Sequence, residues 1–247
     1  MVKRNIVLDL DSTLIFTFDR LEVIHKLIDS DDDLSWLSSH SYIIEMNDPE
    51  ETGTNVPYIM WGLYRPYLTE FATYVIENFD NVYIWSAGKR KYVNAIIDNI
   101  FPPLAYNPPI ILDFEHTNVD SVTNEIVKPL EEIYKLSGGK ANESNTYVLD
   151  DRKDTFSLNV KNGILAPKYE FEEWTKDTHD EWLKSVHENI TTDTFLKELI
   201  CFFDKNEDVE DVRTLNLSDE FPHTNTVSYI DRIVCDKRIS PSHNIRQ

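Results

Sequence analysis

Short apolar runs alternate along the chain with longer segments in which apolar and polar residues are mixed. Four of these runs lie at residues 5–10, 81–85, 146–150 and 163–167. A short apolar run bounded by polar residues is typical of a strand that is buried on both faces. The pattern therefore predicts a sheet built from these four strands.

The segments between the runs carry apolar residues at spacings of three and four, which is the period of an amphipathic helix. Three such segments span residues 68–79, 92–100 and 130–134. Pro66 suits the start of the first helix, and Gly138-Gly139 is expected to end the third. Strands that alternate with helices predict an α/β fold, with a parallel sheet flanked by helices.

Two regions do not follow this alternation. Residues 18–64 contain two apolar segments around the turn-rich sequence NDPEETGTN. This pattern predicts an inserted β-hairpin after the first strand, which we expect to act as a lid. Residues 206–247 begin with an acidic stretch and end in a polar sequence, so we expect an extension that is partly packed or frayed. The main domain is then expected to cover residues 1–205.

Charge and composition limit the classes of partner. Lys and Arg number 24 against 44 Asp and Glu, and the resulting net charge of −20 is the opposite of a nucleic-acid-binding surface. The sequence has no apolar run long enough to span a membrane and no signal-peptide pattern. The two cysteines, Cys201 and Cys235, suit a reducing compartment. We expect an intracellular protein of the nucleus or cytoplasm, not secreted and without direct nucleic-acid or membrane binding; its oligomeric state is left open.

Pairs of acidic residues occur at the ends of two predicted strands. Asp9 and Asp11 follow the first strand, and Asp150 and Asp151 stand at the end of the strand at 146–150. An acid at a strand end can simply be solvated or form a turn, and this alternative stays open for each pair. However, neighbouring carboxylates repel each other unless a cation or a proton lies between them. Because parallel strands bind ligands at their carboxyl ends, the pairs together predict a Mg2+ site.

Three further polar residues are expected at the same edge of the sheet. Ser86 follows the strand at 81–85 and opens a helix after a flexible turn, which suits contact with phosphate oxygens. Lys128 precedes the third helix, and Arg152 follows the second acidic pair, so both can supply positive charge. Each has an ordinary alternative, since Ser86 could cap the helix, Lys128 could be a surface lysine and Arg152 could neutralise the acids beside it.

Four sequence motifs resemble those of a known enzyme family. VLDLDSTL matches the hhhhDxDxT motif of haloacid dehalogenase (HAD) superfamily phosphatases. RPYLTEF…NVYIWSAGKRKYVNAIID and IVKPL resemble segments of the small RNA polymerase II C-terminal-domain (CTD) phosphatases, and VLDDRKDTF looks like a segment of the larger ones. Because all four motifs occur in order across residues 5–205, the chain is similar to the NLI-interacting-factor-like, DxDxT-type CTD phosphatases.

The resemblance implies a HAD-like fold and a Mg2+-dependent phosphatase that works through an aspartyl-phosphate. Asp9 would be the nucleophile, and Asp11 would be the general acid and then the general base. The metal ligands would come from Asp9, from the backbone carbonyl of Asp11, and from Asp150 or Asp151. The expected phosphate-binding residues are Thr13, which would also orient the first loop, Ser86, Lys128 and Arg152.

Two departures from the family pattern concern the site. Ser86 stands where the family usually has Thr, which keeps the hydroxyl. Asp151 stands where the small phosphatases have Asn, so the choice of metal ligand between Asp150 and Asp151 stays open. The implied substrate is a phosphoserine protein such as the CTD. The alternatives are a HAD phosphatase for a small phosphorylated metabolite and a non-catalytic protein-binding relative, the latter disfavoured by the intact DxDxT motif.

Overall fold

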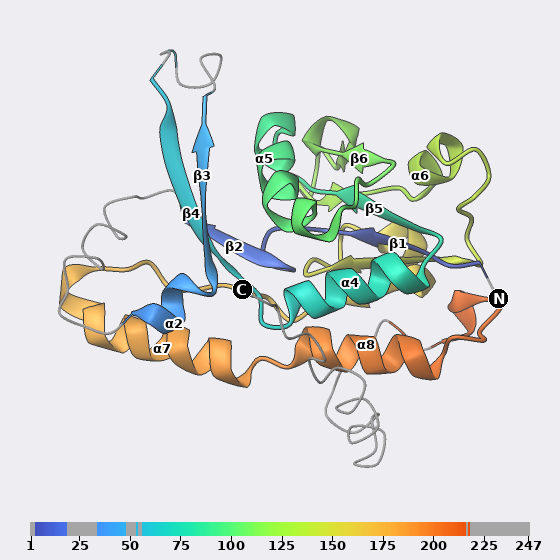
Figure 1. Cartoon of the computed structure of the whole chain (residues 1–247). Coiled ribbons are helices and arrows are strands. Elements are labelled where there is room, and N and C mark those ends of the chain that lie inside the picture. The colour runs from blue at the N-terminus through green and yellow to red at the C-terminus, as the bar shows by residue number, and fades with distance from the viewer. Residues whose placement is uncertain (1–2, 19–33, 48–52, 54–55, 216, 218–247) are drawn as a thin grey trace.

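A five-stranded parallel sheet forms the centre of the molecule (Figure 1). The structure is a computed structural model, and it describes residues 3–18, 34–47, 53, 56–215 and 217. In order across the sheet, the strands are β10 (Gly163–Leu165), β9 (Thr146–Asp150), β1 (Asn5–Leu8), β5 (Asn81–Trp85) and β6 (Ile111–Leu112). The four predicted strands are confirmed as parallel neighbours, and β6 extends the sheet beyond them.

Helices cover both faces of this sheet. Ile6 and Leu8 of β1 belong to an apolar cluster with α4 (Leu68–Asn78), α5 (Arg90–Ile100) and α8 (Phe195–Lys205). Val7, which points to the opposite face, packs in a second cluster beside α6 (Glu131–Leu136). This layering explains why the strand sequences are apolar without alternation, and it confirms the predicted α/β class with flanking helices.

A separate antiparallel sheet is inserted after the first strand. Its order is β2-β4-β3, with β2 at Ile15–Phe18, β4 at Tyr58–Tyr64 and β3 at Ser41–Met46. The predicted hairpin corresponds to β3 and β4, whose connecting residues 48–52 and 54–55 lie outside the described residues. The sequence did not indicate β2, which makes this sheet three-stranded and attaches it directly to the loop after β1. Its action as a lid stays a prediction.

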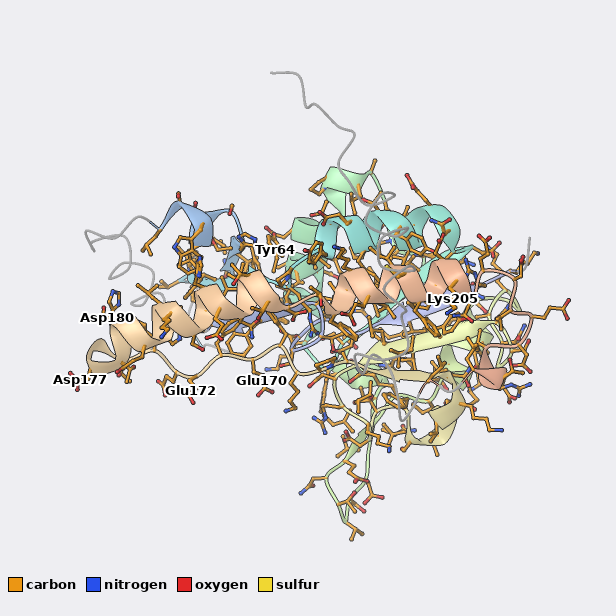
Figure 2. All side chains as sticks on the ribbon, turned by 90° about the horizontal axis from the view of Figure 1, so that it is seen from below. Tyr64, Glu170, Glu172, Asp177, Asp180 and Lys205 are labelled. Atoms are coloured by element: carbon orange, nitrogen blue, oxygen red, sulfur yellow. The ribbon has the colours of Figure 1, made fainter. Side chains whose placement is uncertain are left out.

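Aromatic residues fix the inserted sheet on a long helix. Phe18 stacks on Trp61 with ring centroids 4.3 Å apart, and both contact Trp182 of α7 (His179–Thr192). Helices α7 and α8 follow each other along the same side of the molecule, and Asp180 and Lys205 mark the far ends of this pair (Figure 2). The inserted sheet is therefore held against the body of the protein by its own apolar face. The short helix α2 (Ser35–Ser38) precedes β3.

Short elements complete the described part of the chain. They are η1 (Pro102–Leu104), η2 (Phe114–His116), the antiparallel pair β7 (Asn118–Val119) and β8 (Ile126–Val127), η3 (Ser157–Asn162), η4 (Lys176–Thr178) and η5 (Val212–Thr214). Helix α6 ends before Gly138 and Gly139, both at positive φ, as the sequence predicted. Within the described residues, no helix has the length and apolar character needed to cross a membrane.

Two observations concern the C-terminal part. Val212 and Leu217 are buried in the larger apolar cluster, and the division of domains at residue 205 stays a prediction. Cys201 on α8 is disulfide-bonded, whereas the small number of cysteines suggested a reducing compartment. The other cysteine of the chain, Cys235, lies outside the described residues.

Candidate active site

The carboxyl edge of the parallel sheet brings the predicted acids together. The central strand β1 pairs with β5 on one side and with β9 on the other. The strand order therefore reverses at β1, because β5 and β6 continue the sheet on one side and β9 and β10 continue it on the other. Ligands of open parallel sheets bind in the crevice at such a reversal of strand order. Asp9 follows β1 directly and is fixed there by the hydrogen bond from its backbone N–H to the Leu149 carbonyl, at 3.0 Å. Asp150 ends the neighbouring strand β9.

Lys128 lies between these two carboxylates. Its Nζ is 2.7 Å from Asp9 Oδ1 and 2.6 Å from Asp150 Oδ2, and its side chain is only 2% exposed. Lys128 follows β8, and its backbone N–H donates to the Thr155 carbonyl. Burial alone would lower the pKa of Lys128, but the carboxylates of Asp9 and Asp150 outweigh it and raise that pKa. Lys128 is therefore a buried, charged group and not the surface lysine that the sequence left open.

Thr13 joins the loop after β1 to the loop after β9. Its hydroxyl donates to Asp9 Oδ2 at 2.9 Å and accepts the backbone N–H of Asp151 at 3.0 Å. The Asp151 carboxylate is a longer acceptor for the same hydroxyl, at 3.4 Å. Thr13 thus links Asp9 to the second acidic pair, and the orienting role that the family resemblance implies for it stays a prediction.

Three carboxylates are close enough to hold one cation. Oxygen atoms of Asp9, Asp150 and Asp151 all lie within 4.8 Å of one another. Burial raises the pKa of Asp9 despite the neighbouring Lys128, and the negative charge of Asp150 raises it further. Burial, together with the charge of Asp150, also raises the pKa of Asp151 to about 6. One lysine does not compensate this cluster fully, so the residues present fit a hard divalent cation such as Mg2+.

Asp11 has quite different surroundings from Asp9. Its carboxylate accepts a short hydrogen bond from the Tyr92 hydroxyl on α5 and a longer one, at 3.5 Å, from the Thr17 hydroxyl on β2. Burial raises the pKa of Asp11, while these two hydroxyl donors oppose the shift. The Asp11 side chain lies outside the three-carboxylate group, so a metal contact through this residue would use its backbone carbonyl.

Arg65 holds the loop after β1 through hydrogen bonds, and the sequence pattern assigned it no individual role. This buried side chain donates through Nη1 to the carbonyls of Thr13 and Pro167, both at 2.9 Å, and through Nε to Asp193. Its guanidinium also lies 4.4 Å from the centre of the Phe195 ring. The only hint in the sequence was its position. Arg65 lies between the apolar strand β4 and the start of a helix, where its neighbours are expected to be buried.

Ser86 and Arg152 both lie at the expected edge of the sheet, but their side chains have different partners. Ser86 is buried after β5, and its Oγ accepts the N–H of Gly88 at 2.9 Å, so the hydroxyl is held by its own turn. Arg152 is partly exposed, and its guanidinium pairs with Asp154 at 2.6 Å. The Arg152 N–H donates to Asp150 Oδ1, which makes its backbone part of the site. A phosphate contact by the Arg152 side chain stays a prediction.

Comparison with known proteins places the chain in a family. Residues 4–213 match the model of the NLI interacting factor-like phosphatases. The chain belongs to this family. It is 31% identical over 150 residues to the ubiquitin-like domain-containing CTD phosphatase 1 of Drosophila melanogaster, covering 58% of this chain and 43% of that protein. Its Arabidopsis thaliana counterpart is 28% identical over 134 residues, covering 52% and 39%. The chain thus spans less than half the length of these relatives.

Solved structures of CTD phosphatases share the fold. A fission yeast RNA polymerase II CTD phosphatase, an Fcp1 variant bound to beryllium fluoride, aligns with a TM-score of 0.54 and 16% identity over 83% of this chain and 57% of its own. A second Fcp1 structure gives the same TM-score and identity over 96% and 61%. The resemblance to NLI interacting factor-like CTD phosphatases and the HAD-like fold are both confirmed. The roles of individual residues in this family member stay predictions.

Proposed function

We propose that this protein is a Mg2+-dependent protein phosphatase that removes phosphate from phosphoserine through an aspartyl-phosphate on Asp9. The observation that carries this proposal is the position of Asp9, at the end of the central strand and bonded to both Lys128 and Thr13. A carboxylate held in this way is available to attack phosphorus from a fixed direction. The relatives named as CTD phosphatases support a phosphorylated protein substrate, of which the CTD of RNA polymerase II is an example.

The first chemical step is transfer of the phosphoryl group to the protein. A carboxylate oxygen of Asp9 forms a bond to phosphorus while the bond from phosphorus to the serine oxygen breaks. Asp11 gives its proton to that leaving oxygen, so the product is a neutral serine hydroxyl. The raised pKa of Asp11 favours the protonated form that this step requires.

The second step releases phosphate and restores the protein. Asp11, now ionised, takes a proton from a water molecule as the water oxygen bonds to phosphorus and the Asp9–phosphorus bond breaks. Lys128 has three N–H donors, and the carboxylates of Asp9 and Asp150 use two of them. The third is available for a phosphoryl oxygen. Ser86 would supply another donor from the turn after β5.

We propose different functions for Asp150 and Asp151 in metal binding. Asp150 already accepts hydrogen bonds at both oxygens, from Lys128 and from the Arg152 N–H. The Asp151 carboxylate accepts a longer bond from the Thr13 hydroxyl, at 3.4 Å, so we assign the ligand of this pair to Asp151. Asp9 and the Asp11 carbonyl are the other ligands that the family resemblance implies. Bound Mg2+ would neutralise negative charge on the phosphoryl group. Asp150 then acts by holding Lys128 in place.

A substrate panel tests the proposal. Purified protein is incubated with Mg2+ and phosphoserine peptides, phosphorylated sugars and an aryl phosphate, and released phosphate is measured. We expect turnover of the aryl phosphate and the peptides, and its loss on chelation with EDTA. Preference for the sugars would indicate a metabolite phosphatase, and binding of phosphopeptides without turnover of any substrate would indicate a non-catalytic relative. The proposed location in the nucleus or cytoplasm requires a separate measurement in cells.

A further inference from the structure

A chain of hydroxyl groups leads from Asp11 into the inserted sheet. Tyr92 donates to Asp11 Oδ1, and the Tyr92 hydroxyl is also hydrogen-bonded to the Thr17 hydroxyl. Thr17 is in turn 2.6 Å from the hydroxyl of Tyr42, which is buried on β3. Three hydroxyls from three different elements, β2, β3 and α5, are therefore connected to one carboxylate oxygen.

A glycine in the middle strand allows Tyr42 to reach this chain. Thr17, Gly62 and Tyr42 lie at one register across β2, β4 and β3, because Gly62 pairs with both of the others. A Cβ atom on Gly62 would lie 2.3 Å from the Tyr42 hydroxyl oxygen. Tyr42 thus lies across the bare backbone of Gly62 to contact Thr17, an arrangement that a larger residue at position 62 would prevent.

A second glycine makes room for Tyr92. A Cβ atom on Gly88 would lie 2.8 Å from the Tyr92 ring and 3.2 Å from Ser86 Oγ. The Tyr92 ring therefore packs on the turn that holds Ser86. Tyr42 and Tyr92 are thus both positioned by close contact with a glycine. Gly62 lies in the inserted sheet, and Gly88 lies at the expected phosphate site.

The donor order of the chain follows from its chemistry. A carboxylate accepts hydrogen bonds and a phenol donates to it, so Tyr92 directs its hydroxyl proton at Asp11 Oδ1. Thr17 can then direct its proton at the Tyr92 oxygen, with Asp11 Oδ1 as a second, more distant acceptor at 3.5 Å, and Tyr42 can donate to Thr17. In this order each hydroxyl uses its single proton once. Oδ1 of Asp11 is thereby engaged as an acceptor, which leaves Oδ2 to hold the catalytic proton.

We propose that Thr17, Tyr42 and Tyr92 are positioning residues for the general acid, holding Oδ1 of Asp11 so that Oδ2 delivers the proton to the leaving oxygen. In this step the proton moves from Oδ2 to the serine oxygen as the phosphorus–oxygen bond breaks and the bond to Asp9 forms. The inference rests on the proposed role of Asp11. It makes the inserted sheet part of the catalytic apparatus, whatever motion that sheet undergoes.

Leaving groups of different basicity separate positioning of the acid from other effects. Expulsion of p-nitrophenolate needs little protonation, whereas expulsion of a serine alkoxide depends on it. For Tyr42→Phe and Thr17→Val we expect kcat/KM to fall about tenfold on a phosphoserine peptide and to stay within about threefold on p-nitrophenyl phosphate. Thr17→Ser, which restores a hydroxyl, should recover most of the peptide activity.

The matched control is Tyr64→Phe. Tyr64, which is labelled in Figure 2, lies in the same inserted sheet, with its ring centre 4.8 Å from that of Tyr42. Its hydroxyl is not one of the three that form the hydrogen-bonded chain to Asp11. This variant should keep wild-type kcat/KM on both substrates, and urea unfolding should show that all variants are folded. Equal losses on both substrates, or no loss for Tyr42→Phe in an active protein, would overturn the positioning role alone. An inactive wild-type protein would overturn the phosphatase function and this role together.

Discussion

Asp9 and Asp11 are two residues apart, yet different sheets determine their surroundings. Asp9 forms a salt bridge with Lys128 at the edge of the parallel sheet. Asp11 is bonded to neutral hydroxyls, which come from α5 and the inserted antiparallel sheet. Burial raises the pKa of both carboxyls, and the main influence against that shift is the charge of Lys128 at Asp9 and the hydroxyl donors Tyr92 and Thr17 at Asp11. These different surroundings are consistent with the two roles that we propose, a nucleophile at Asp9 and a proton donor at Asp11, within one short loop.

Substitution of each acid should therefore block a different step of the reaction. We expect Asp9→Asn to lower turnover by about a thousandfold or more, because an amide cannot attack phosphorus. Asp11→Asn should still accept phosphate from an aryl phosphate but lack the base that activates water. Rapid-quench mass spectrometry should then find phosphate retained on Asp9. If Asp9→Asn keeps more than about 1% of wild-type turnover, another nucleophile must be present.

Lys128 should be the residue whose loss most affects folding on the Asp9 side. Lys128→Met leaves the buried carboxylates of Asp9 and Asp150 without their shared cation, and breaking such a pair costs about 3–5 kcal/mol. The control is Lys135→Met, which removes an exposed pair with Glu132 and should cost less than about 1 kcal/mol. Urea unfolding in metal-free buffer measures both. Similar losses for the two variants would mean that the buried cluster is not held by Lys128.

The Asp9 side could be predicted from the sequence, and the Asp11 side could not. Asp9, Asp150 and Ser86 each follow an apolar run, so knowledge of the parallel sheet is enough to bring them to one edge. The contact between Tyr42 and Thr17 depends on the register of three antiparallel strands and on a glycine in the middle one. That register is a tertiary property, set partly by aromatic packing against α7. The pairing of β2 and the burial of Arg65 also depend on tertiary contacts, so the sequence did not indicate them.

Gly62→Ala tests that register on the Asp11 side. The added methyl would approach the Tyr42 ring and hydroxyl and would also lie 2.5 Å from the Phe16 carbonyl oxygen. We expect a loss of about 1–3 kcal/mol in the free energy of unfolding, which is typical of overpacking. In a Tyr42→Ala background the same change should cost less, because one of the two close contacts is gone. A double-mutant cycle that shows no coupling would contradict the crossing of Gly62 by Tyr42.

The smallest expected effect concerns pH and Mg2+ on the Asp9 side. Burial, with the charge of Asp150, raises the pKa of Asp151 from 3.8 to about 6, and burial raises that of Asp9 as well. Between about pH 4 and pH 6 the Asp151 carboxyl thus binds more protons in the folded protein than in the unfolded chain, so its contribution to metal-free stability should fall as pH rises through this window.

Mg2+ should oppose that loss, because it binds the ionised carboxylates and only in the folded state. We expect the increase in Tm caused by Mg2+ to be larger at pH 7.5 than at pH 5, by about 2–4 °C if the added stability is about 1 kcal/mol. Asp151→Ala should remove most of the increase, whereas Asp11→Asn should preserve it, because Asp11 is assigned to the metal through its backbone carbonyl. An increase in Tm that is independent of pH, or one that survives Asp151→Ala, would show that Mg2+ binds elsewhere and that Asp151 is not its ligand.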